Sequence, residues 1–98
     1  MRYIEFDPVR NYYERLVFEY IVEKYGDSGL DNDLLQDVAC LALNQLPARY
    51  VRFPVDVAFY ISSKELVEIR NAVDNAVQRA MEFVRGNPRR SDTGGLPR

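Results

Sequence analysis

Apolar side chains recur at helical spacing along three stretches of the chain, and the first stretch runs from Val9 to Tyr25. Asp7 followed by Pro8 is typical of an N-cap and a first helical residue, and Gly26 is placed to end the helix in the left-handed conformation. Many aromatic residues widen the apolar face beyond a single stripe. Either a partner chain covers the second side of this helix, or the tyrosines are core residues with their hydroxyls at the rim.

The second helical stretch runs from Leu34 to Leu46. Asp31 or Asn32 can serve as its N-cap, and Pro47 ends it because proline disfavours helical conformation in the residue before it. Asp37 and Asn44 lie seven residues apart in this stretch, about two helical turns. We therefore expect both side chains to project from the same side of the helix.

The segment between the second and third helices changes from helical to extended periodicity. Residues Arg49 to Phe53 alternate in polarity and predict a short strand or extended loop. Residues Val55 to Ile61 are rich in β-forming residues but are also compatible with a helical turn. The pattern leaves both structures open for them.

The third helical stretch begins with a capping box, in which Ser62 is the N-cap and Glu65 reaches back to its amide. It ends at Gly86, and about 23 residues at 1.5 Å each give a rod of roughly 35 Å. That length equals or exceeds the width of about 30 Å expected for so small a domain. Small residues at Ala72, Ala76 and Ala80 would let another helix approach closely, so we expect a helical homodimer.

Together these elements predict a mainly α fold, a small domain of three main helices with a short extended segment after the second. We assign residues 1–86 to this domain and residues 87–98 to a disordered basic tail. The N-terminal residues never develop the apolar core of a signal peptide. The longest apolar window is far shorter than the ~20 residues of a membrane span, so no membrane association is expected.

Composition excludes most metal and nucleophile chemistry, because the 98 residues include one cysteine and no histidine. The cysteine, Cys40, has apolar neighbours and is predicted to be a buried core residue. A lone cysteine cannot form an intramolecular disulfide, which favours a reducing cytoplasm. No base that titrates near neutral pH is present, so we expect neither a catalytic residue nor enzyme activity.

Charge is divided unevenly along the chain. The net charge is −2; the tail from Asn87 carries three arginines and one aspartate, a net of +2, which leaves −4 for residues 1–86. An acidic body with a short basic tail does not have the footprint of a duplex nucleic-acid binder. Direct nucleic-acid binding is therefore not expected.

The strongest candidate site follows the end of the second helix. Arg49, Tyr50 and Arg52 lie there, with Asn44 one turn before and Asp56 a few residues later. Guanidinium groups bind phosphate, tyrosine stacks on a base, and a carboxylate accepts from the N1 and N2 donors of guanine. The set suits a nucleotide, although purely structural roles are the commoner outcome for such a loop: Arg49 could cap helix carbonyls and Tyr50 could be a core residue.

The same region carries a family resemblance. Asp37-Val-Ala-Cys-Leu-Ala-Leu-Asn-Gln-Leu-Pro-Ala-Arg-Tyr-Val-Arg52, together with Asn11-Tyr-Tyr-Glu-Arg-Leu-Val-Phe18 and Asp56-Val-Ala-Phe-Tyr60, resembles the late-competence ComFB family. The resemblance implies a small, mostly helical, dimeric cytoplasmic protein without enzyme activity. Similar members of the cyanobacterial kind look like receptors for cyclic di-GMP and cyclic di-AMP. Other members bind zinc through a cysteine cluster just before the Asp-Val-Ala segment; residues 29–36 contain no cysteine here, so no metal or other cofactor is expected.

The resemblance places Asn44, Arg49, Tyr50 and Arg52 on the shared motif, with Asp37 and Asp56 at its flanks. On chemical grounds the two arginines are phosphate or guanine contacts, the tyrosine is the stacking platform, and the two aspartates are base-edge acceptors. The leading hypothesis is a cyclic dinucleotide receptor that acts on a protein partner such as a transcriptional regulator. The alternative is a ligand-free dimeric interaction module, which would bury and pair the segment from Arg49 to Arg52.

Overall fold

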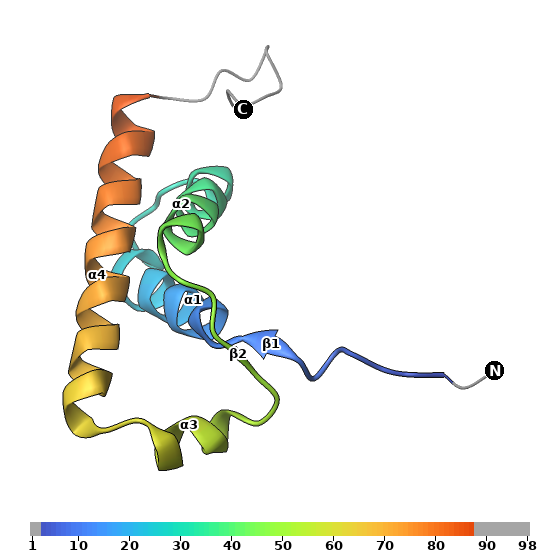
Figure 1. Ribbon diagram of the computed structural model, residues 1–98. Coiled ribbons are helices and arrows are strands. Elements are labelled where there is room, and N and C mark those ends of the chain that lie inside the picture. The colour runs from blue at the N-terminus through green and yellow to red at the C-terminus, as the bar shows by residue number, and fades with distance from the viewer. Residues whose placement is uncertain (1–2, 88–98) are drawn as a thin grey trace.

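The computed structural model describes residues 3–87, apart from the side chains of residues 54, 56 and 58. Three main helices form the domain: α1 (Tyr12–Tyr25), α2 (Asn32–Gln45) and α4 (Ser63–Gly86), with the short α3 (Pro54–Tyr60) before α4. In Figure 1, α4 runs along the whole height of the molecule, and α1 and α2 lie on one side of it. The prediction of a mainly α domain is confirmed; the predicted tail lies outside the described residues, apart from Asn87.

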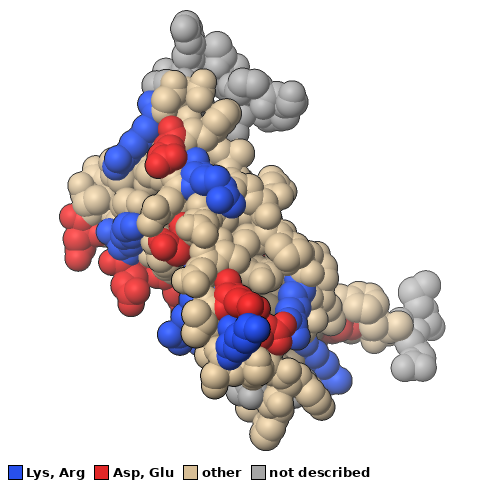
Figure 2. Space-filling view, turned by 60° about the vertical axis from the view of Figure 1, so that its left-hand side comes forward, with Lys and Arg blue, Asp and Glu red and all other residues tan. Residues whose placement is uncertain are grey.

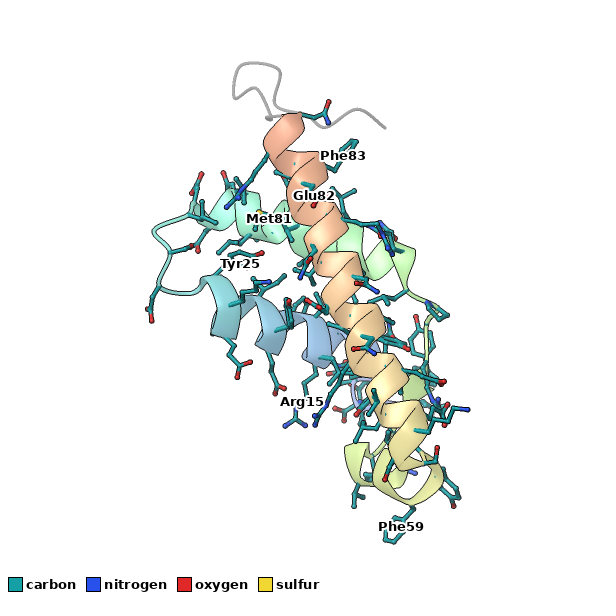
Figure 3. All side chains as sticks on the ribbon, turned by 90° about the vertical axis from the view of Figure 1, so that its left-hand side faces the viewer. Arg15, Tyr25, Phe59, Met81, Glu82 and Phe83 are labelled. Atoms are coloured by element: carbon teal, nitrogen blue, oxygen red, sulfur yellow. The ribbon has the colours of Figure 1, made fainter. Side chains whose placement is uncertain are left out.

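The core lies where α4 crosses α1 and α2, as Figure 3 shows. Its residues are small and aliphatic, apart from one tyrosine and one methionine, because the helices cross at close range. The core consists of Tyr13, Val17, Ile21, Val38, Ala39, Ala42, Ile69, Val73, Ala76, Val77, Ala80, Met81 and Val84.

Two of the three alanines of α4 are covered within the chain. Ala76 is fully buried and Ala80 is 1% exposed, and α2 packs against α4 more extensively than any other element does. The helix that approaches this stripe is therefore α2 of the same chain. Ala76 and Ala80 therefore need no second chain to cover them, and the homodimer predicted from the length of this helix and its alanines stays a prediction.

The start of α1 differs from the prediction. Asp7 and Pro8 form a turn, closed by a 2.9 Å hydrogen bond from the Val9 amide to the Phe6 carbonyl, instead of beginning the helix. Arg10–Asn11 forms the strand β1, which pairs antiparallel with β2 (Tyr50–Val51) in a two-stranded sheet. Asn11 is the N-cap of α1, because its Oδ1 accepts from the Tyr13 amide. The N-cap therefore lies four residues later than predicted, at Asn11 instead of Asp7.

The end of α1 also needs a correction. Gly26 has φ −58° and ψ −34°, which is right-handed helical, so it is not a left-handed cap. The left-handed glycine of this connector is Gly29, with φ +79°. Ser28 closes the turn by donating to the Tyr25 carbonyl and accepting from the Leu30 amide. The helix ends at Tyr25 as predicted, but the left-handed glycine comes three residues later than predicted, after the turn that Ser28 closes.

The connection from α2 to α4 largely follows the sequence. The amide of Leu46 bonds the Leu43 carbonyl at the end of α2, and the extended segment predicted after it is β2. Residues Val55–Ile61, left open by the sequence, are mostly the helix α3, which begins at a proline. Ser62 caps α4 by accepting from the Glu65 amide at 3.1 Å.

Two faces of the helices are more exposed than the sequence suggested. Cys40 on α2 is exposed, so the prediction that it is a core residue is wrong. Phe18 and Val22, on the outer face of α1, are 48% and 69% exposed. Among the described residues nothing covers this second side of α1. None of the helices in residues 3–87 is long and apolar enough to span a bilayer.

Candidate ligand-binding groove

One asparagine fixes the loop that follows α2. The Oδ1 atom of Asn11 accepts a 2.9 Å hydrogen bond from the Arg49 amide, in addition to its bond with the Tyr13 amide. The Arg49 carbonyl in turn accepts from the Tyr12 amide. These bonds hold the backbone of Arg49 against the first turn of α1, so its side chain leaves from a fixed position.

The side chain of Arg49 lies in a groove of about 460 Å³ between this loop and the first half of α4. Its Nη1 is 3.1 Å from Glu65 Oε2, and the two side chains are 40% and 42% exposed. An ion pair this exposed contributes only about 0–1 kcal/mol to stability. The groove is lined by Tyr13, Pro47, Ala48, Arg49, Glu65, Glu68, Ile69 and Ala72.

Tyr13 contributes the buried aromatic side of the groove. Tyr13 is 7% exposed, and its ring meets that of Tyr12 edge-on at 6.4 Å between centroids. Burial raises the pKa of Tyr13, which the nearby Arg49 charge opposes and the Glu65 charge reinforces. The phenol therefore stays protonated at neutral pH and can donate a hydrogen bond. Proline, alanine and isoleucine complete an apolar wall beside one cation and two carboxylates.

The structure separates the three predicted residues of the loop. Among the residues that line the groove, Arg49 is present, whereas Tyr50 and Arg52 are not. Tyr50 is 68% exposed on β2, and the Arg52 guanidinium lies 4.7 Å from the centre of the Phe53 ring. The alternation of side chains along an extended segment accounts for this, since Tyr50 and Arg52 share one side and Arg49 takes the other.

The remaining predicted residues lie away from the groove or cannot be placed. Asn44 is exposed near the end of α2, whereas Asp37 is buried at 8% exposure. Their different exposures mean that the two side chains do not share one open surface, although the seven-residue spacing puts them on the same side of the helix. The Asp56 side chain lies outside the described residues.

Residues 10–88 match the family described as late competence development protein ComFB. The chain belongs to the ComFB family. The match runs from β1 through α4, and so includes every residue that lines the groove. No curated protein and no solved structure matches the chain significantly.

Sequence patterns missed two residues that line this ComFB-family groove and one, Asn11, that positions its loop. Glu65 was assigned to a capping box, and its amide does bond Ser62, but its carboxylate contacts Arg49. Glu68 and Asn11 were not singled out. Glu65, Glu68 and Ala72 recur at helical spacing on one face of α4, which is a usable signal. Which face of α4 meets the loop is decided only by tertiary packing.

The electrostatics of this ComFB-family domain are mixed. In Figure 2, lysine and arginine are interspersed with aspartate and glutamate on the face in view. The groove follows the same pattern, with one arginine opposite two glutamates. Among the described side chains, no group of three or more metal-ligating residues comes together. The groove offers one guanidinium, hydrogen-bond acceptors and an apolar wall.

Proposed function

We propose that this ComFB-family chain is a cytoplasmic receptor for a cyclic dinucleotide, cyclic di-GMP or cyclic di-AMP, and that it acts on a protein partner such as a transcriptional regulator. The observation that carries the proposal is the groove at Arg49. Its volume of about 460 Å³ lies within the range of small-molecule sites. The backbone of Arg49 is fixed by its hydrogen bond to Asn11. Its guanidinium makes only an exposed ion pair with Glu65 and is therefore available to a ligand.

The groove offers a partner for each part of a nucleotide. Arg49 exchanges Glu65 for a phosphate, since guanidinium binds phosphate through two parallel hydrogen bonds. The face of a base packs on Pro47 and Ile69, which line the groove beside Arg49. Glu68 is placed to accept from the edge of a guanine, which presents N–H donors that adenine lacks at the same positions.

The loop outside the groove can hold the second half of the ligand. Tyr50 and Arg52 are exposed a few residues beyond Arg49, and a tyrosine ring and a guanidinium are the usual stacking surfaces for a base. A cyclic dinucleotide carries two bases on a ring closed by two phosphodiesters, so the base outside the groove is available to an exposed stacking surface such as Tyr50 or Arg52. The proposed receptor performs no enzymatic step.

Calorimetric titration of the purified chain with cyclic di-GMP, cyclic di-AMP and a linear dinucleotide tests this function. We expect saturable binding of at least one cyclic species, and a loss of roughly 10–100-fold in affinity for Arg49→Ala, as expected for a charge-assisted hydrogen bond. The matched control is Arg79→Ala, because Arg79 is exposed and bonds Gln45 outside the groove. Absence of binding by either cyclic species at tens of micromolar protein overturns the proposal.

A second candidate function is favoured by the surface of α3. Phe59 and Tyr60 are both 81% exposed there, and Figure 3 shows Phe59 pointing away from the helices at one end of the molecule. Exposed aromatics that are close together are typical of protein interaction sites. A ligand-free interaction module would bind its partner through Phe59 with the same affinity whether or not a cyclic dinucleotide is added. For a receptor, adding a cyclic dinucleotide would change the affinity for the protein partner.

A further inference from the structure

We propose that the groove at Arg49 selects a phosphodiester, which carries one negative charge, over a terminal phosphate, which carries about two. Glu65 and Glu68 set this selectivity, and the Tyr13 hydroxyl binds the phosphate as a neutral donor. The inference rests on the proposed function, since it concerns the ligand of the same groove. It specifies the charge that the bound phosphate must have, whichever base the ligand carries.

The charges that line the groove do not balance. Among the lining residues Arg49 is the cation and Glu65 and Glu68 are the anions, so one positive charge against two negative charges leaves a net charge of −1. Glu65 lies in the first turn of α4, where the helix dipole favours a negative carboxylate. Glu68 follows three residues later on the same face of the helix. A ligand that binds Arg49 therefore meets two carboxylates beside it.

A phosphate with a single negative charge fits this arrangement. It takes the place of Glu65 at the Arg49 guanidinium, where Nη1 and Oε2 are now 3.1 Å apart, and its one charge is matched by the one cation. A phosphodiester has this charge, as in the backbone of a nucleic acid. A terminal phosphate carries about −1.5 to −2 at neutral pH. Its second charge would face the displaced Glu65 carboxylate and Glu68, and would be repelled by both.

The neighbouring cations do not correct this imbalance. Arg52 is not among the lining residues, and its guanidinium lies 4.7 Å from the centre of the Phe53 ring. Lys64 is exposed at the start of α4 and is also absent from the lining. Sites for terminal phosphates usually gather several arginines, or the backbone amides of a glycine-rich loop at a helix N-terminus. Among the described residues, the lining of this groove offers one guanidinium for the task.

Tyr13 supplies a hydrogen-bond donor that adds no charge. Within the described part of the chain its hydroxyl forms no hydrogen bond, and no fully buried side-chain oxygen or nitrogen lacks one. The hydroxyl therefore keeps access to solvent, although Tyr13 as a whole is only 7% exposed. The open space that Tyr13 lines is the groove, so a ligand there can accept the hydrogen bond that the protein leaves unmade.

The phenol of Tyr13 lies close to both members of the ion pair. Burial raises the pKa of Tyr13, the Arg49 charge lowers it, and the Glu65 charge raises it. A phosphate at Arg49 is therefore near the hydroxyl as well. Each oxygen of a phosphodiester that bears the negative charge can accept more than one hydrogen bond, so Tyr13 can donate to an oxygen that Arg49 also binds. Such a neutral donor strengthens binding without compensating a second negative charge.

Competition against a fluorescent cyclic dinucleotide, of the base that the wild type prefers, tests the charge selectivity. The competitors are the linear dinucleotide of the same base with a 5′-phosphate, and its methyl ester, in which the terminal phosphate has become a phosphodiester with one negative charge fewer. We expect the wild type to bind the methyl ester at least about fivefold more tightly. The ratio should fall to about one in the double variant Glu65→Gln/Glu68→Gln. Glu82→Gln, an exposed glutamate that does not line the groove, is the matched control and keeps the ratio.

Tyr13→Phe tests the neutral donor. It should weaken the binding of both competitors by a similar factor of about five, as expected for one hydrogen bond between a neutral donor and an anion. Because the hydroxyl forms no hydrogen bond within the described residues, circular dichroism should show the same melting temperature as for the wild type. Tyr12→Phe is the matched control, since Tyr12 is the neighbouring tyrosine and does not line this groove.

Equal binding of the 5′-phosphate and its methyl ester to the wild type overturns the inference. Failure of both linear compounds to compete at millimolar concentration overturns it too, because ring closure and not charge would then decide. A ratio that persists in the double glutamine variant, or an unchanged affinity of Tyr13→Phe, removes these residues from the role and counts equally against it. In all these outcomes the cyclic ligand still binds. If the labelled cyclic dinucleotide does not bind the wild type, the proposed function itself fails, and the inference with it.

Discussion

The guanidinium of Arg49 lies 3.1 Å from the carboxylate of Glu65, and this contact joins the loop after α2 to the first turn of α4. About two-fifths of each side chain remains exposed, so water screens the pair and its contribution to folding is small. The same contact occupies the cation that the proposed ligand needs. Glu65 therefore competes with a phosphate for Arg49.

Replacing Glu65 by glutamine should strengthen ligand binding. The Glu65→Gln variant no longer holds Arg49 through charge, and loss of a competing exposed pair corresponds to up to about fivefold in affinity. Titration calorimetry with cyclic di-GMP measures the change. Glu82→Gln, an exposed glutamate near the other end of α4, is the control with the same charge change. An affinity that falls with Glu65→Gln would show that the carboxylate binds the ligand instead of competing with it.

Glu68 should determine which base is preferred. Its carboxylate lines the groove beside Ile69 and can accept from the N–H donors at a guanine edge, whereas adenine offers no such pair. We expect Glu68→Gln to lower the preference for cyclic di-GMP over cyclic di-AMP by up to about tenfold. Parallel titrations of the two ligands measure the ratio, and equal losses for both would assign Glu68 a role unrelated to base identity.

Asn11 should matter for both stability and binding. Asn11→Ala removes the N-cap of α1 together with the bond to the Arg49 amide, and loss of such a cap costs about 0.5–2 kcal/mol. Urea denaturation measures the loss, and ligand affinity should fall because the loop is released. Asn71→Ala is the control, since Asn71 is exposed within α4 and alanine favours helix there. Equal stabilities of Asn11→Ala and wild type would rule out the double role.

The hydrogen bond between Tyr20 and Asp74 should make stability depend on pH. The Tyr20 hydroxyl donates to Asp74 Oδ1 and holds the pKa of Asp74 below its ordinary value of 3.8, with smaller help from Gln78 and Lys24. Because the pKa is lower in the folded state, the stabilisation is present above about pH 4 and is lost as the pH falls through the folded value.

The Tyr20→Phe variant isolates this effect. It should be less stable than the wild type at neutral pH, with a difference that shrinks as the pH is lowered from about 5 to about 2. NMR titration of Asp74 should show its pKa rising toward 3.8 in this variant. Tyr25→Phe removes a hydroxyl from the same helix without touching Asp74 and serves as the control. A pH-independent difference would assign the effect of Tyr20 to packing alone.

The alanine stripe of α4 should tolerate no enlargement. Ala76 is fully buried in the core where α2 packs on α4, so Ala76→Leu should destabilise the chain by about 1–3 kcal/mol through overpacking. Denaturant unfolding measures this loss. Ala48→Leu, at an exposed position outside the helices, is the control. If Ala76→Leu left the stability unchanged but altered self-association, the alanine stripe would belong to a dimer interface and not to the core.

The sequence predicted the three main helices because each buries a face with clear 3.6-residue periodicity. The predicted start of α1 was wrong, because Asp7-Pro8 is locally as good a signal for a helix N-terminus as Asn11 is. The helix starts at Tyr12 because Arg10 pairs with Val51, about forty residues later in the chain. A local sequence pattern cannot show this pairing. The prediction that Cys40 is buried was wrong for a similar reason. Its neighbours in the sequence are apolar, but Cys40 itself lies on the exposed side of α2.

The candidate site was predicted only at its centre. Arg49 could be found because its residue type and its place after a helix suit an anion. The helical spacing of Glu65 and Glu68 places them on one face of α4, but it does not show that this face meets the loop, because that contact forms only in the folded chain. Tyr50 and Arg52 were grouped with Arg49 by sequence proximity, although an extended backbone sends adjacent side chains to opposite sides.

The hydrogen bond from the Arg49 amide to Asn11 spans 38 positions along the chain. It closes a loop that contains the whole of α1 and α2, and the entropy of that closure must be overcome before the groove exists. The binding surface is therefore absent from partly folded chains in which the two helices have formed but not docked. A ligand held at Arg49 adds its binding free energy to global folding, so it should slow amide exchange throughout both helices and not only in the loop it touches.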